Sequence, residues 1–131
     1  MMIYKIFMTT FLIFTSVTIA YCQLRTLNDC SVLKKYKLQY LSLKDSSAYI
    51  MISQDSVVEY HHHEKYTLRA KIDWTNDCEY DMTLTSVTIP DFSYRLGDVM
   101  HVRIDRIEHD IVYYISTING NSWEGKLRVV R

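Results

Sequence analysis

The stretch that decides the fold is residues 66–84, which reads YTLRAKIDWTNDCEYDMTL. Apolar residues occupy every second position in two runs, 66–74 and 78–84, and the positions between them are mostly polar. Alternation with a period of two is typical of antiparallel strands that pack one face on a core and expose the other. The stretch therefore predicts two half-buried strands, with Cys78 on the packed face.

Short apolar runs bounded by turn residues continue on both sides of this stretch. They predict further strands at 35–40, 48–53, 56–60, 99–107, 111–117 and 123–129. Asn119 and Gly120 form a typical hairpin turn, and Pro90 marks a longer loop. We expect an all-β fold, an antiparallel meander of about eight short strands that forms a small, lipocalin-like barrel or half-barrel; a two-sheet sandwich is the alternative.

The N-terminus has the features of a secretory signal peptide. Lys5 precedes an apolar stretch at 6–20 that ends in small residues and is shorter than a membrane-spanning helix. Cleavage after Ala20 or after Cys22 fits this pattern, and acylation of Cys22 is a third option, the only one that predicts a membrane anchor. We therefore expect a signal helix at 1–22, a single all-β domain at 23–131, and an exported protein that is periplasmic, in the cell envelope or secreted.

Charge and cysteine content limit the classes of function. Residues 1–22 contain one lysine and no acid, which leaves 14 basic and 15 acidic side chains in the remainder. A nearly neutral chain lacks the basic patch that binds nucleic acid, so no nucleic-acid partner is expected. Cys30 and Cys78 form an even pair in an exported chain and predict a disulfide across about 48 residues, with two buried free thiols as the alternative.

Three histidines at 61–63 suggest a weak metal site. In an extended strand, Glu59, His61 and His63 would share one face and could supply three zinc ligands. That face would be the solvent side if Val58 and Tyr60 pack inward. The alternative is an exposed hairpin end.

A second group of titratable residues follows in the next part of the chain. It consists of His101, Asp105, Glu108, His109 and Asp110. An acid and a base for hydrolysis could come from such residues. Because the sequence has no nucleophile motif, metal motif or glycine-rich phosphate loop, we predict a protein that is not an enzyme and needs no cofactor.

Aromatic residues give the strongest indication of a ligand site. Five of them lie on alternating stripes: Tyr66, Trp74, Tyr80, Tyr113 and Trp123. Core packing is the usual role of such side chains, yet a small barrel lined by them can also hold an apolar or aromatic ligand. A closed interior filled with rings would argue against a carrier, and an open cavity would favour one.

Several blocks resemble small exported proteins of Bacteroidetes-type bacteria, which have no established activity. The blocks are Cys30, residues 35–40, residues 72–83 and residues 96–99. Lys35 departs from the glycine that the resembling proteins usually carry there. Some of those proteins have a DNA topoisomerase label, which this short, exported and nearly neutral chain does not support. The resemblance implies location and architecture more than activity.

Three functions follow as hypotheses. The first is a non-enzymatic envelope or binding module with an unknown partner. The second is a small lipocalin-like carrier of an apolar or aromatic ligand. The third is a metal-dependent or hydrolytic enzyme that uses the histidine clusters.

Overall fold

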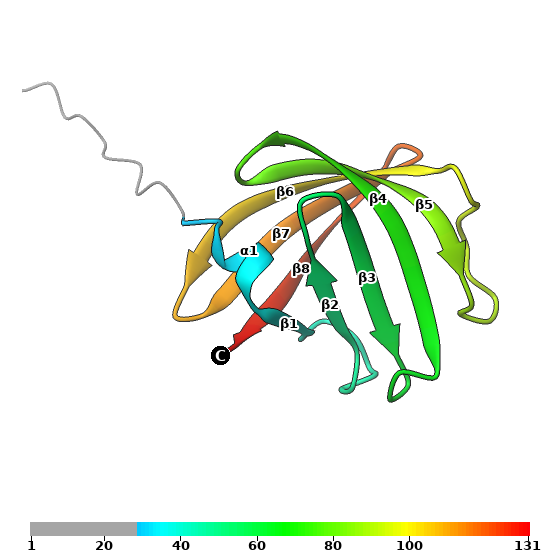
Figure 1. Ribbon diagram of the computed structural model, residues 1–131, viewed down its shortest axis with the longest axis horizontal. Coiled ribbons are helices and arrows are strands. Elements are labelled where there is room, and N and C mark those ends of the chain that lie inside the picture. Colours follow the sequence, from blue (N-terminus) through cyan, green and yellow to red (C-terminus); the bar gives the residue numbers. More distant parts are fainter. Residues whose placement is uncertain (1–28) are drawn as a thin grey trace, which may run out of the picture.

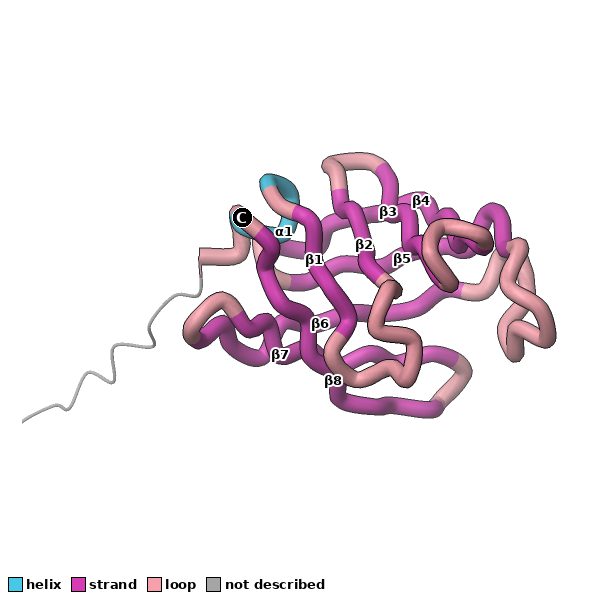
Figure 2. Tube along the Cα trace, turned by 90° about the horizontal axis from the view of Figure 1, so that it is seen from below, coloured by secondary structure: helices cyan, strands magenta, loops and turns pink. Residues whose placement is uncertain are grey.

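The predicted strands form a closed barrel in a computed structural model, which describes residues 29–131 (Figure 1). Its strands are β1 Lys37–Tyr40, β2 Tyr49–Ile52, β3 Ser56–His61, β4 Tyr66–Asn76, β5 Glu79–Val87, β6 Val99–Glu108, β7 Ile111–Ile118 and β8 Asn121–Val130. Each strand pairs antiparallel with the next, and β8 pairs with β1 to close the barrel (Figure 2). The all-β barrel prediction is confirmed, and the half-barrel and sandwich alternatives are wrong.

The alternation in residues 66–84 places the core as predicted. Leu68, Ala70 and Ile72 of β4 are buried, and so are Tyr80 and Met82 of β5. Polar residues between them face outward, because successive side chains of a strand point to opposite faces. Cys78 packs against the core as predicted, but it lies in the turn between β4 and β5 and not on a strand.

The turns alternate between the two ends of the barrel, as in any up-and-down meander. Residues 41–48, 62–65, 88–98 and 119–120 connect strands at one end, which we call the mouth. Asn119 and Gly120 have φ values of 48° and 78°. Positive φ at both central residues is what a type I′ two-residue hairpin turn requires, so the predicted hairpin is confirmed.

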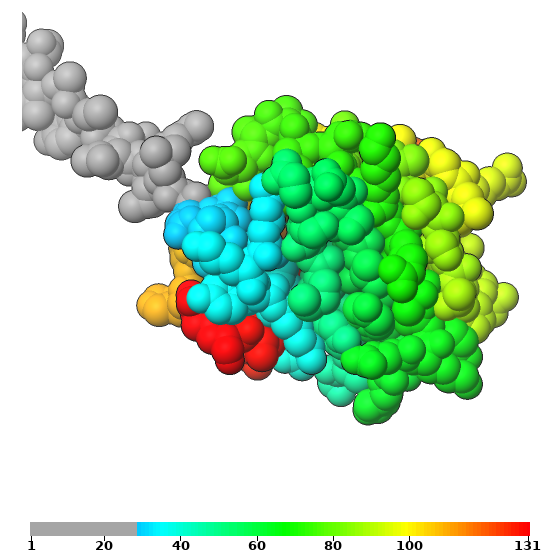
Figure 3. Space-filling model, viewed as in Figure 1, coloured from blue at the N-terminus to red at the C-terminus, as the bar shows by residue number. Residues whose placement is uncertain are grey.

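A short helix that the sequence did not predict covers the opposite end. Helix α1, Val32–Lys35, inserts Leu33, which is fully buried, into the interior. In Figure 3 the blue and cyan atoms of this segment pack beside the green atoms of β2 and β3 and the red C-terminal atoms. We call this end of the barrel the plugged end.

The disulfide between Cys30 and Cys78 is present and fixes this helix. Cys30 lies in the turn just before α1, and Cys78 lies in the β4–β5 turn. The predicted pairing is confirmed, and α1 lies between Cys30 and the first strand. The disulfide ties the plug to the central hairpin.

The predicted signal peptide, residues 1–22 with Cys22, lies outside the described residues. Within residues 29–131, no helix has the length and apolar character needed to cross a membrane.

Candidate ligand-binding cavity

A cavity of about 210 Å³ occupies the barrel interior. It begins at the buried Leu33 of the plug and reaches Leu43 and Trp123 at the mouth, which are 44% and 36% exposed. Aliphatic and methionine side chains form much of the wall: Ile50, Ile52, Leu68, Met82, Met100, Val102, Ile104 and Leu127. The interior is therefore an apolar chamber whose lining reaches solvent at the mouth.

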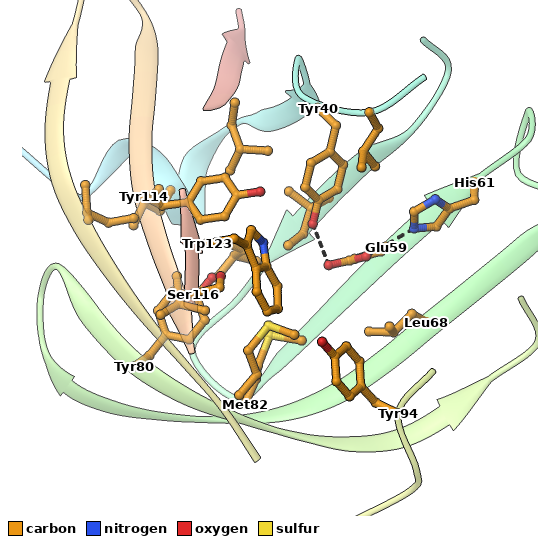
Figure 4. A pocket seen from close by; sticks show the side chains of 18 of the residues that line it. Tyr40, Glu59, His61, Leu68, Tyr80, Met82, Tyr94, Tyr114, Ser116 and Trp123 are labelled. Atoms are coloured by element: carbon orange, nitrogen blue, oxygen red, sulfur yellow. Dashed lines mark hydrogen bonds and ion pairs between the residues drawn. The ribbon is translucent and has the colours of Figure 1, made fainter. Parts of the chain in front are cut away.

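Aromatic side chains complete the wall. They are Tyr40, Tyr80, Phe92, Tyr94, Tyr114 and Trp123. Tyr94 stacks on Trp123 with ring centroids 6.4 Å apart, and Phe92 meets Tyr94 edge to face at 5.8 Å. These three form an aromatic rim at the mouth, while Tyr80 and Tyr114 lie deeper (Figure 4).

Gly125 of β8 makes room for the Tyr114 ring. The two residues face each other across the β7–β8 ladder. A Cβ at position 125 would overlap the Tyr114 ring, so a side chain there would push the ring out of its place. Glycine at this position keeps Tyr114 against the barrel wall and leaves the chamber open.

One carboxylate, Glu59, lies inside this apolar chamber. Its side chain is 14% exposed. The Tyr40 hydroxyl donates a 2.5 Å hydrogen bond to Glu59 Oε1, and His61 Nε2 lies 3.1 Å from Glu59 Oε2 (Figure 4). The described residues that line the cavity include no lysine or arginine. The chamber therefore has an acid and no permanent cation facing it.

The charge of Glu59 influences tyrosines around the chamber. Burial raises the pKa of the Tyr40 hydroxyl well above its ordinary value, and the negative charge of Glu59 adds to the effect. The same two causes, in the same order, raise the pKa of Tyr80 and raise that of Tyr114 to about 12. These hydroxyls stay protonated at neutral pH and can act as hydrogen-bond donors.

Of the five predicted ligand residues, some line the cavity and others lie outside it. Tyr80 and Trp123 line the cavity. Trp74 packs at the plugged end, with its ring 4.9 Å from that of Tyr80 and its Nε1 donating to the Gln54 carbonyl. Tyr66 begins β4 at the mouth, where its ring meets the His62 ring edge to face. Neither Trp74 nor Tyr66 lines the cavity.

The prediction that Tyr113 binds a ligand inside the barrel is wrong, because Tyr113 lies on the outer surface. The Arg106 guanidinium lies 3.8 Å from the centre of its ring, and Lys126 Nζ lies 5.6 Å from it. Of two successive residues on a strand only one can face inward, and on β7 that residue is Tyr114. The sequence held a signal for this: a two-residue turn at Asn119 and Gly120 pairs Tyr114 with Gly125.

The predicted metal trio is not brought together. Glu59 and His61 meet inside the barrel, with Val57, so the prediction that their face is the solvent side is wrong. His63 has φ 54° in the turn after β3, and its backbone N–H donates to Ser47 Oγ. The strand ends before His63, and no group of three metal-ligating side chains forms within residues 29–131.

The second titratable group is spread over the outer surface and a turn. Arg106 pairs with Asp105 at 3.0 Å and with Glu108 at 3.4 Å. Asp110 pairs with Arg131. His109 occupies the β6–β7 turn with φ 51°. Apart from His101, these residues form surface ion pairs or occupy a turn.

His101 bridges two acids on the outer face of β5 and β6. Its Nδ1 lies 2.6 Å from Asp81 Oδ1, and its Nε2 lies 2.7 Å from Glu79 Oε1. The hydrogen bond with Asp81 raises the pKa of His101; partial burial opposes the shift, and the bond with Glu79 adds to it. The protonated ring is therefore favoured in the folded state.

This bridge predicts a pH-dependent contribution to stability. Because the folded-state pKa is raised, the stabilisation is full below the unfolded pKa of about 6.5 and is lost as pH rises through the folded value. We expect the difference in melting temperature between the wild type and His101→Gln to shrink between about pH 6 and about pH 9. Thermal unfolding followed by circular dichroism measures it, and a difference that grows with pH would contradict the assignment.

No protein family, curated protein or solved structure matches the chain in comparisons with known proteins. The cavity geometry is therefore the basis for a functional hypothesis.

Proposed function

We propose that this protein is a non-enzymatic, lipocalin-like carrier that binds a small apolar or aromatic ligand in its barrel. The observation that carries the proposal is the apolar chamber that runs from the plug to the exposed aromatic rim at the mouth. Binding sites for small molecules are concave and mostly apolar, with few polar groups that orient the ligand. The chamber fits this description, and Glu59 with its two partners supplies the polar group.

The cavity volume limits the size of the ligand. A dry protein cavity of about 150 Å³ can hold benzene, and sites for drug-sized molecules span about 300–1,000 Å³. At about 210 Å³, the chamber suits a molecule of one ring or two fused rings. A long-chain lipid would exceed it.

Export is part of the proposal. The Cys30–Cys78 disulfide supports an oxidising compartment, where such bonds persist. The N-terminal sequence, with Lys5 and its short apolar stretch, supports a signal peptide. The resemblance to exported Bacteroidetes-type proteins stays a prediction.

A substitution that fills the cavity with a larger side chain tests the binding function. Ser116 of β7 is 2% exposed and lines the cavity, so Ser116→Phe would place a ring where the ligand binds. We expect the wild type to bind 2-phenylethanol or indole at a single saturable site, and the variant to bind at least about tenfold more weakly. Isothermal titration calorimetry measures both affinities.

The neighbouring position gives a matched control. Ile115 faces outward on the same strand, opposite Arg103 and Glu124, so Ile115→Phe adds a ring outside the chamber. We expect its affinity to stay within about twofold of the wild type. If wild type binds no small aromatic compound, or if both variants lose affinity equally, the carrier function is refuted.

A further inference from the structure

We infer that the ligand carries a positively charged amine beside its apolar body, and that Glu59 is the group that recognises it. This inference rests on the proposed carrier function and adds the chemical class of the ligand. Its basis is the placement of a single carboxylate among aromatic rings in a chamber without a lysine or arginine among the described lining residues.

The carboxylate is held in one orientation by two neighbours. Tyr40 donates to Oε1, and His61 Nε2 contacts Oε2, so both oxygens are fixed. The rings of Tyr40 and His61 stack with centroids 6.2 Å apart, which steadies the group further. A preorganised anion binds a cation without the entropic cost of ordering its own side chain.

Both carboxylate oxygens can still accept hydrogen bonds. An ionised carboxylate has about four acceptor positions on its two oxygens, and Tyr40 and His61 use two of them. A hydrogen on His61 Nε2 makes this ring a donor to Glu59 Oε2, so the carboxylate is the acceptor in both contacts. An ammonium group, which has three donors and no acceptor, matches the remaining positions.

The aromatic wall favours the same class of ligand. Tyr80, Tyr94, Tyr114 and Trp123 line the same chamber as Glu59. The faces of such rings carry negative partial charge and attract cations within about 6 Å of the ring centre. The negative charge of Glu59 also reaches Tyr80 and Tyr114, whose pKa it raises after burial. The carboxylate and these aromatic rings thus line one chamber, where both can attract a cation.

The distribution of polarity along the barrel orients such a molecule. Glu59 lies toward the mouth end of β3, while Leu33 closes the plugged end. An arylalkylamine would place its ring among Leu33, Val102 and Leu127 and its amine near Glu59. A carboxylate ligand would meet the charge of Glu59 with no compensating lysine or arginine among the described lining residues.

The test compares ligands that differ only in charge. We expect 2-phenylethylamine to bind the purified, disulfide-intact protein at least about tenfold more tightly than neutral 2-phenylethanol, because a desolvated charge-assisted hydrogen bond is among the strongest in proteins. Phenylacetate should bind most weakly of the three. Calorimetric titration at one ionic strength gives the three affinities.

Substitution of the carboxylate separates charge from shape. In Glu59→Gln the tenfold preference for the amine should fall to about twofold or less, while the affinity for 2-phenylethanol changes little. Glu64→Gln is the matched control, because Glu64 accepts a 2.5 Å hydrogen bond from the Tyr49 hydroxyl on the exposed outer side. That variant should keep the full preference.

The outcomes distinguish this inference from the carrier function. If no member of the series binds, the carrier function itself fails. If 2-phenylethanol binds and the amine binds no more tightly, the carrier function stands, the amine inference is wrong, and Glu59 only braces Tyr40 and His61. Should Glu59→Gln fail to fold, the wild-type ranking of amine, alcohol and carboxylate decides the inference without it.

Discussion

Replacement of both Cys30 and Cys78 by serine is expected to lower the free energy of unfolding by about 4 kcal/mol. The disulfide closes a segment of 48 residues, and the entropy that this loop removes from the unfolded chain corresponds to about that value. For a domain of this size, such a loss lowers the melting temperature by roughly 15–30 °C. Urea and thermal unfolding of the oxidised wild type and the double variant measure the difference.

A reductant provides the control for this experiment. Wild type treated with a thiol reductant should unfold at the same temperature as the double variant, because both lack only the cross-link. Intact mass without reductant should lie two mass units below the reduced chain, which verifies the bond before unfolding. A double variant that melts within a few degrees of the oxidised protein would show that the disulfide contributes little.

The substitution Leu33→Ala should cost about 2–5 kcal/mol, the usual range for a fully buried leucine. Leu33 has no exposed surface and closes the cavity at the plugged end. Its loss removes apolar contacts and leaves a void that the disulfide-anchored helix cannot easily fill. Urea unfolding of the purified variant gives the change in free energy.

Leu43→Ala is the matched control, because it removes the same atoms at the other end of the same cavity. Leu43 is 44% exposed, so we expect a loss below about 1 kcal/mol. Leu33→Ala should also enlarge the chamber and admit a ligand that is one methyl group longer. Equal losses of stability in the two variants would mean that α1 does not act as a packed plug.

The barrel was predictable because most strands alternate clearly. The stripe at 66–84 specifies the pairing of β4 with β5, and the Asn119-Gly120 turn specifies the pairing of β7 with β8. Helix α1 was not predictable in this way, because it has only four residues, too few to show a helical period. Its position follows from Leu33 and the disulfide, which are tertiary constraints.

The site was harder to predict than the fold, because the sequence of the strand that carries Glu59 does not show which of its faces packs inward. Val57 and Val58 are both apolar, so residues 56–60 do not reveal which face packs inward. The structure places Val57 inside, and a shift of one residue moves Glu59 and His61 from solvent to the interior. A carboxylate on the inner face runs against hydrophobic patterning, and such departures are common at functional sites.

The plug leaves the chamber with its opening at the mouth, and this governs how a ligand would exchange. A molecule has to enter with the end that will lie near Leu33 first and leave with the end that faces Glu59 first. Phe92, Tyr94 and Trp123 line that route, so in the proposed carrier they would control the rates of association and dissociation. The rim would then set the residence time of the ligand, while Glu59 inside the barrel would set its selectivity, and the two properties could change independently.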